Sequence, residues 1–371
     1  MASKPLYVPT LKARRCDLDA FTRLGESTKS AVKPLLEIPL RPSDCGLLEH
    51  IEKSIKAIGR WGACSFFFDP YGLLPGERLP DGSLAEIYTL QHVAKFLHHQ
   101  ITPLYGLDRA PQTWTALRPL VSQLATGFGF RITLKDVENA FGDTWEQIVL
   151  KAAALNLSAT DIDLVLDLRD IAGRDVDELL DIVVDFIAEA PDSYRSMVLL
   201  GSSTKKTVAD VPRDGRDAIA RTELQVWARL HYELAQTVTL HFGDYVTTHP
   251  DFIIAGKNKN ANAKIRYTAG YKTHYFRGHG LYKPKSDFAQ YHDLAKAVVN
   301  SGLFYGHHYS WGDSEIARKT ESRAEPGNLS TWIKIASNHH MAVATEQLVP
   351  LSQRLSKSTS TREVDALLNA L

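Results

Sequence analysis

Runs of apolar residues alternate with stretches of helical period along the first 250 residues of the chain. The runs are short and rich in β-branched or aromatic residues, which favours strands, whereas the stretches between them have the spacing of amphipathic helices. The eight predicted strands are 6–12, 32–40, 64–70, 101–108, 127–135, 161–170, 197–203 and 237–246. A helical pattern follows each of the first seven, the last of these patterns spanning 216–235. The chain therefore repeats a strand–helix unit.

Several of these strands are apolar almost throughout, for example "LVLDL" (164–168) and "MVLLG" (197–201). Parallel strands covered by helices on both faces require this pattern. Eight such units in about 250 residues are typical of a closed barrel. The alternative is an open doubly wound sheet, which is disfavoured because the first unit lacks a glycine-rich phosphate turn. We predict an α/β fold, a TIM-like (β/α)8 barrel.

Beyond residue 250 the regular alternation ends. The segment 256–285 is rich in Gly, Asn, Lys and Tyr, and its pattern predicts loops or a β-ribbon. Two helical patterns follow, and we expect the second to end at Pro350 because proline cannot continue a helix. The predicted organisation is a barrel over 1–250 and an additional C-terminal loop-and-helix region over 251–350, packed on the barrel mouth. A tail over 351–371 is either mobile or packed as one short helix.

Composition gives the chain no overall preference for a charged partner. Lys plus Arg and Asp plus Glu each number 43, so the formal net charge is zero and nothing draws the whole molecule to nucleic acid or anionic membranes. The three cysteines form no Cys-x-x-Cys pair, which is typical of a reducing compartment. The chain shows neither the apolar region of a signal peptide nor the roughly 20 apolar residues of a membrane helix. We expect a cytoplasmic protein with no membrane partner.

Polar residues gather at the predicted carboxyl ends of the strands, where barrels of this class carry their active sites. The main ones are Lys12, Glu37, Asp69, Asp108, Arg109, Arg131, Asp167, Arg169, Asp244 and Tyr245. Arg131 lies between "GFGF" and "ITL", and an unpaired charge in such surroundings costs several kcal/mol. We therefore expect it to meet a carboxylate or an anionic ligand. The alternative is that these charges only pair with one another or cap the following helices.

Two further features carry weaker signals. The loop "GSSTKKT" (201–207) follows the seventh strand, where barrels often bind phosphate, but it lacks a P-loop pattern. Asn338, His339 and His340 are consecutive within a helical pattern. Adjacent helical residues point about 100° apart, so the two histidines do not form a metal clasp. We predict that His339 points into the barrel and that His340 packs elsewhere.

Several motifs resemble one protein family. In chain order they are "YVPTLKAR", "VKPLLEIP", "LHFGDYVTTHPDF", "KIRYT", "YFRGHG", "QYHDLAKAV", "YSWGDSEI", "PGNLSTW" and "SNHH". In these motifs the chain is similar to the Beta protein family of phages, satellite phages and prophages, over most of residues 6–348. The resemblance singles out Lys12, Glu37, Asp167, Asp244, Tyr245, Arg266, Tyr267, Arg277, Gly278, Asp313, Trp332, Asn338, His339 and His340. It implies a role in conflict between phage and host, and some members belong to defence gene clusters.

Two functional hypotheses follow. In the first, the chain is a component of a mobile-element-encoded anti-phage defence system of toxin/immunity type. Its barrel mouth binds an anion or phosphate, and its partner is a companion protein of the same gene cluster. In the second, the chain is a phosphodiesterase or nucleotide hydrolase with Glu37, Asp167 and His339 as catalytic residues.

The residues assigned to anion or substrate binding are Lys12, Arg131, Arg169, Arg266, Arg277, Tyr245, Asp244 and Asn338. Arginine suits this role because its forked donors match oxyanions. The cofactor is left open, with a divalent metal as the candidate, and no metal ligands are assigned. The basic segment 256–285 has no acidic residue and is a further candidate for binding a nucleotide or nucleic acid.

Overall fold

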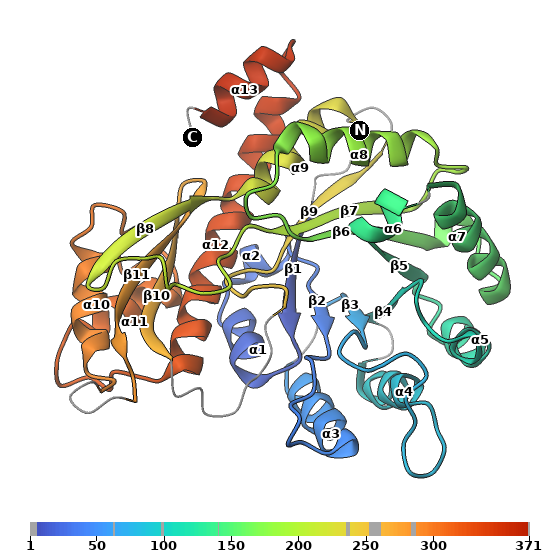
Figure 1. Cartoon of the computed structure of the whole chain (residues 1–371), viewed down its shortest axis with the longest axis horizontal. Coiled ribbons are helices and arrows are strands. Elements are labelled where there is room, and N and C mark those ends of the chain that lie inside the picture. The colour runs from blue at the N-terminus through green and yellow to red at the C-terminus, as the bar shows by residue number, and fades with distance from the viewer. Residues whose placement is uncertain are drawn as a thin grey trace.

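Eight parallel strands form a closed barrel (Figure 1). The computed structural model describes residues 6–61, 64–97, 100–139, 141–234, 238–251, 261–282 and 287–369. The barrel strands are β1 (Tyr7–Lys12), β2 (Leu35–Glu37), β3 (Phe66–Asp69), β4 (Ile101–Gly106), β5 (Phe128–Thr133), β6 (Ile162–Asp170), β7 (Ser196–Ser202) and β9 (Leu240–Asp244). Strand β9 closes the barrel on β1, with Tyr7 opposite Phe242. The predicted (β/α)8 barrel is confirmed, and the open sheet is wrong.

Two layers of apolar side chains stabilise the barrel. Residues such as Val8, Phe67 and Val198 fill its interior. Alternate residues of the same strands, such as Leu11 and Leu166, pack outward against the helices. Because successive strand residues face opposite sides, the residue after an outward-facing one points into the barrel. This alternation decides which strand-end side chains reach the mouth.

Helices cover the outer face of the barrel. They are α1 (Arg15–Thr22), α2 (Glu26–Lys29), α3 (Leu47–Ile58), α4 (Ala85–Leu97), α5 (Pro111–Leu124), α6 (Leu134–Asn139), α7 (Phe141–Leu155), the 3-10 turn η2 (Ala159–Asp161), α8 (Val176–Ala188) and α9 (Thr222–Glu233). Helix α3 buries Ile51 and Ile58 and exposes Lys53, as an amphipathic surface helix does. Helix α8 is capped at its N-terminus by Asp175, whose carboxylate accepts two backbone N–H bonds.

A three-stranded antiparallel sheet lies beside the barrel (Figure 1). Its order is β10 (Asn262–Ala269), β11 (Lys272–Gly280) and β8 (Gly215–Ala220). Strands β10 and β11 form the predicted ribbon. The predicted helix over 216–235 is wrong at its start, because 215–220 is strand β8 and α9 begins only at Thr222. Strand β8 pairs with β11, a segment distant in the chain, and a local pattern carries no trace of that pairing.

Four helices complete the C-terminal part: α10 (Gln290–Val299), α11 (Trp311–Arg318), α12 (Leu329–Leu355) and α13 (Thr361–Asn369). Helix α12 lies between the barrel and the small sheet (Figure 1). The prediction that Pro350 ends this helix is wrong. Burial of Leu351 and Leu355 beyond the proline offsets the backbone bond that it removes. None of the helices within the described ranges is long and apolar enough to cross a membrane.

Candidate functional site

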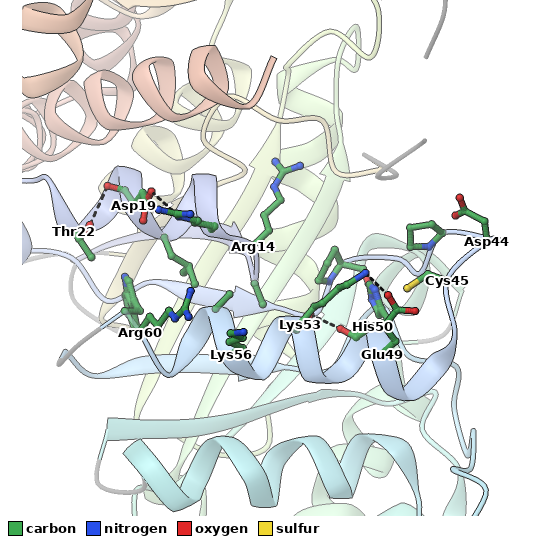
Figure 2. A pocket seen from close by; sticks show the side chains of 18 residues that line it. Arg14, Asp19, Thr22, Asp44, Cys45, Glu49, His50, Lys53, Lys56 and Arg60 are labelled. Atoms are coloured by element: carbon green, nitrogen blue, oxygen red, sulfur yellow. Dashed lines mark hydrogen bonds and ion pairs between the residues drawn. The ribbon is translucent and has the colours of Figure 1, made fainter. Parts of the chain in front are cut away.

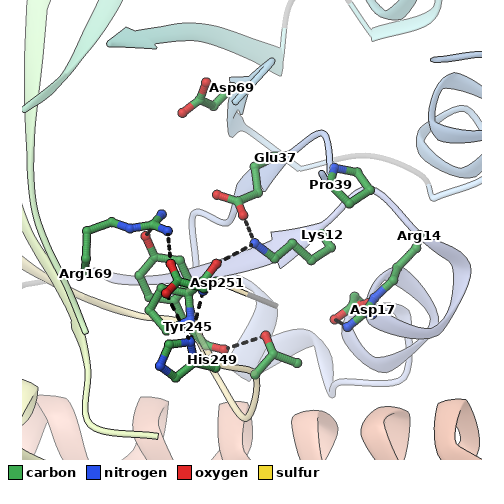
Figure 3. A network of polar contacts seen from close by, with 12 residues as sticks. Lys12, Arg14, Asp17, Glu37, Pro39, Asp69, Arg169, Tyr245, His249 and Asp251 are labelled. Carbon is green, nitrogen blue, oxygen red and sulfur yellow. Dashed lines mark hydrogen bonds and ion pairs between the residues drawn. The ribbon is translucent and has the colours of Figure 1, made fainter. Parts of the chain in front are cut away.

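Six polar side chains from the carboxyl ends of six strands point into the barrel and meet at its mouth. This mouth cluster consists of Lys12, Glu37, Asp69, Arg131, Asp167 and Tyr245, each at most 2% exposed. In each case the preceding residue, such as Leu11 or Leu36, faces outward, so the alternation of the strand turns the polar side chain inward. Figure 3 shows several of them around the interior of the mouth. The expected gathering of polar strand-end side chains is thus observed for these six residues.

Arg131 is the centre of the mouth cluster. One of its terminal nitrogens lies 2.6 Å from Asp69 Oδ2 and 3.1 Å from Glu37 Oε2. The other lies 2.7 Å from Asp167 Oδ2 and 2.6 Å from Tyr245 Oη. Burial alone would lower the pKa of Arg131, but its polar neighbours, chiefly Tyr245 and Asp167, hold that pKa well above its ordinary value. The expectation that Arg131 meets carboxylates is confirmed, and its donors are already occupied within the protein.

Lys12 and Glu37 form a second ion pair within the cluster (Figure 3). The Lys12 ammonium also lies 3.5 Å from the carbonyl oxygen of Pro250. Burial and the nearby guanidinium groups of Arg131 and Arg169 lower the pKa of Lys12 below its ordinary value, whereas contact with Glu37 favours the charged form. Lys12 is therefore the member of the cluster best suited to exchange a proton near neutral pH.

Arg169 is the outermost of the cations that contact the mouth cluster. Its side chain is 20% exposed, and it donates to Asp251 over 2.8 Å and to Tyr245 over 3.2 Å. Its φ of 58° lies in the left-handed region, where the Asp167 carboxylate accepts its backbone N–H. The Tyr71 ring lies 4.9 Å from the Arg169 guanidinium carbon and 4.6 Å from that of Arg131. Arg169 therefore connects the buried cluster to solvent.

The charges of the mouth nearly cancel. Lys12, Arg131 and Arg169 face Glu37, Asp69 and Asp167. Buried Arg109, 3.8 Å from Asp69, is balanced by Glu86, so the cations and carboxylates of the interior balance. Asp251, whose side chain is 49% exposed, adds one negative charge at the rim, between Arg169 and the exposed Lys206, whose ammonium lies 3.5 Å away. An incoming anion would have to displace the Asp251 carboxylate from Arg169. The mouth thus offers one cation whose partner is accessible to exchange.

Asp244 does not belong to the mouth cluster. It points outward from β9, where it lies 2.8 Å from His340 Nε2, 2.6 Å from the Tyr7 hydroxyl and 3.3 Å from Arg221. Burial raises the pKa of Asp244, but the His340 and Arg221 charges outweigh it and hold that pKa below its ordinary value. The contacts join β9 and β1 to helix α12. Asp244 is thus an anionic anchor for that helix.

The prediction that His339 points into the barrel is wrong, because His340 is the histidine that reaches a barrel strand. His339 Nδ1 lies 2.7 Å from Asp313 in α11, and its Nε2 lies 2.7 Å from the carbonyl oxygen of Thr268 in β10. His339 is completely buried and contacts none of the mouth carboxylates. Asn338 donates to the Ala20 carbonyl and accepts from the Gly312 backbone, also away from the mouth.

Arg266 and Arg277 also lie apart from the mouth cluster. They belong to β10 and β11, and the guanidinium carbon of Arg266 lies 5.9 Å from the Tyr275 ring centroid. Arg277 donates to the carbonyl oxygens of Ala209 and Val211 in the loop before β8. The residues assigned from the sequence to one anion site therefore divide between the barrel mouth, the α12 contacts and the small sheet.

The loop after β7 is occupied by internal contacts. The Ser203 hydroxyl and backbone N–H donate to Glu223, and Lys205 pairs with Asp210 and Asp217. Burial raises the pKa of Glu223 to about 7. In the described part of the chain, no group of three or more His, Cys, Asp or Glu side chains has an arrangement that could hold a metal ion.

A cavity of about 630 Å³ opens between α1 and α3 (Figure 2). Its lining includes Arg14, Asp19, Glu49, His50 and Lys53, and no member of the mouth cluster contributes to it. The His50 ring is held by the carbonyl oxygen of Pro39 over 2.8 Å. The cavity is therefore separate from the charged mouth.

Sequence reasoning omitted two residues that the geometry brings to the mouth. Tyr71 and Asp251 lie in loops, where no periodic pattern shows which way a side chain points. Lys264 belongs to the basic segment 256–285 proposed from the sequence, and it lies two residues before Arg266 in β10, a spacing that places both side chains on one face.

Comparison with known proteins identifies one family. The model of the Beta protein family matches residues 7–345, which is most of the chain. A search of curated proteins finds no match.

Proposed function

Since the chain belongs to the Beta protein family, we propose that it is a component of a mobile-element-encoded anti-phage defence system whose barrel mouth binds a phosphate-bearing ligand. Family membership supports an origin in a phage or another mobile element. The mouth cluster carries the proposal of a ligand site. Buried ion pairs contribute little net stability, so a cluster of five charged side chains at the strand ends is better explained by a functional site than by folding.

Arg169 is the proposed first contact for the ligand. Its guanidinium offers paired donors to a phosphate, and its current partner Asp251 is half exposed. The ring of Tyr71 and the hydroxyl of Tyr245 fix the guanidinium on its inner side. A bound phosphate would replace Asp251 and leave the inner charges of the mouth balanced.

Substituting Arg169→Asn is expected to weaken phosphate binding about tenfold to a hundredfold, since a hydrogen bond to a charged group contributes about 1.5–3 kcal/mol. Asparagine tolerates the positive φ of this position, so the loop keeps its conformation. Calorimetric titration with inorganic phosphate and with a nucleoside monophosphate measures the effect. Arg174→Asn, which removes an arginine paired with Glu138 and Glu178 on the surface, is the matched control. Equal affinities of the two variants would contradict the proposal.

The second candidate function is hydrolysis of a phosphodiester or nucleotide, and the buried Lys12–Glu37 pair is the observation that favours it. Glu37 would accept a proton from the attacking water, whose oxygen forms the new bond to phosphorus. Lys12 would donate a proton to the leaving oxygen as its bond to phosphorus breaks. A lysine whose pKa is lowered toward neutrality suits this transfer.

Lys12→Arg separates binding from hydrolysis. Arginine keeps the positive charge beside Glu37, but it does not release a proton near neutral pH. If the chain is a hydrolase, the variant should bind phosphate and lose at least about 100-fold in turnover of bis(4-nitrophenyl) phosphate. If the wild-type chain turns over neither this ester nor nucleotides, the hydrolase hypothesis fails and the binding function stands. A stoichiometric complex with a companion protein from the same gene cluster would then define its role.

A further inference from the structure

Three cations share one face of the small sheet. Along β10, Ala263, Ile265 and Tyr267 pack against the helical side, so Lys264 and Arg266 point to the opposite side. Arg277 of β11 lies directly opposite Lys264, and Tyr275 lies opposite Arg266. We name Lys264, Arg266 and Arg277 the sheet cations. All three are partly buried, so they are reachable from solvent without being freely hydrated.

The sheet cations have no acidic partner. Every aspartate and glutamate of the chain falls within the described residues, and none of them forms an ion pair with Lys264, Arg266 or Arg277. The acids of the adjoining segment are engaged elsewhere: Asp210 and Asp217 with Lys205, and Asp214 with His279. The Nε atoms of Arg266 and Arg277 are buried without a hydrogen-bond partner.

This arrangement is costly unless an anion completes it. Like charges directly opposite one another on a sheet destabilise it, and a buried cation without a counter-charge costs more. The nearby Arg266 charge, together with burial, lowers the pKa of Lys264 to about 7. The Tyr275 ring near Arg266 and the carbonyl oxygens around Arg277 orient the guanidinium groups without neutralising them.

We propose that the sheet cations form a second anion site, separate from the barrel mouth, which takes a phosphate-type oxyanion. Three positive charges on one face suit a diphosphate better than a single carboxylate. Lys264 supplies a point charge, and the two arginines supply forked donors. The diphosphate of a small molecule and the successive phosphates of a nucleic acid share this chemistry. The site does not depend on the function proposed for the mouth.

Thermal unfolding of the full chain with added pyrophosphate tests the site. Pyrophosphate should raise the Tm of the wild-type protein, and Lys264→Met and Arg266→Met should each need about tenfold more pyrophosphate for the same rise. Without added anion, both variants should unfold at or above the wild-type temperature, because each removes a repulsive charge. Lys272→Met is the matched control. Lys272 lies on β11 like Arg277, but its exposed side chain points to the opposite face of the strand, away from the sheet cations.

The outcomes separate the two sites and the two ligand sources. In an Arg169→Asn background, which removes the proposed phosphate contact of the barrel mouth, Lys264→Met and Arg266→Met should still weaken the pyrophosphate effect, since Arg169 lies at the mouth and not on the small sheet. A short single-stranded oligonucleotide provides a second test. If it raises the Tm of the wild-type chain more than pyrophosphate does, and does not raise the Tm of Lys264→Met, the site binds nucleic acid. Two results would overturn the proposal. One is that millimolar pyrophosphate does not change the Tm of the wild-type chain. The other is that it changes the Tm of wild type, Lys264→Met and Arg266→Met equally.

Discussion

Replacing Arg131 with methionine is expected to lower the free energy of unfolding by about 3–5 kcal/mol. The guanidinium is the shared partner of Glu37, Asp69 and Asp167, all of them fully buried. Methionine fills a similar volume but removes the closest counter-charge of Asp69 and Asp167, which keep only the more distant Arg109 at 3.8 Å and Arg169 at 3.9 Å. Removing one member of a buried ionic cluster costs far more than the intact cluster contributes, because the charges left behind stay desolvated.

Equilibrium unfolding in urea measures this loss. Arg195→Met is the matched control, because Arg195 also pairs with a buried aspartate, Asp163, which keeps its contacts with Lys33 and Ser196. The Arg195 side chain is about one third exposed, and a loss of about 1 kcal/mol is expected there. If the two variants lose the same free energy, Arg131 is not the central counter-charge of the mouth.

Replacing Asp244 with asparagine is expected to cost a similar amount, about 3–5 kcal/mol near neutral pH. The variant leaves Arg221 with only the more distant Glu223 carboxylate, 3.8 Å from its Nε, and removes the anionic partner of His340. Because these contacts connect β9 to α12, the loss should be accompanied by weaker docking of that helix. Asp293→Asn, at an exposed position of α10, should change the stability by less than about 0.5 kcal/mol.

The Asp244 effect should depend on pH in one direction. The His340 and Arg221 charges outweigh burial and lower the pKa of Asp244 in the folded chain. Its contribution to stability is therefore fully present above the unfolded pKa of about 4 and is lost as the pH falls through the lower folded value. The difference between wild type and Asp244→Asn should be constant near neutrality and shrink in acid. A difference that grows as the pH falls would show that Asp244 is not held as a carboxylate.

The barrel could be predicted from the sequence because each of its strands is marked by a pattern within a few consecutive residues. Each barrel strand is a short apolar run, and the alternation within it also predicts which charges point inward, as for Asp167 and Arg169. The expectation that Arg131 meets carboxylates followed from its apolar sequence neighbours, because a buried charge without a partner is costly. Strand β8 was missed because its partner is β11, and the pairing of distant segments leaves no local pattern.

The directions in which His339 and His340 point could not be predicted from such a local pattern. Helix α12 is buried on several sides, against α1, α11, β10 and α9, so its apolar residues do not define one inward stripe. Trp332 and Ile335 pack with the small sheet, whereas Met341 and Ala344 pack with the barrel helices. The apolar residues at the N-terminal end of α12 therefore face the small sheet and not the barrel.

Thr268 of β10 contacts both consecutive histidines of α12. Its hydroxyl lies 2.7 Å from His340 Nδ1, and its carbonyl oxygen lies 2.7 Å from His339 Nε2. His340 in turn contacts Asp244 at the end of β9. Strand β10 therefore cannot slide relative to the barrel wall without breaking buried hydrogen bonds to consecutive histidines. Buried hydrogen bonds through one turn of α12 thus connect the small sheet to the barrel.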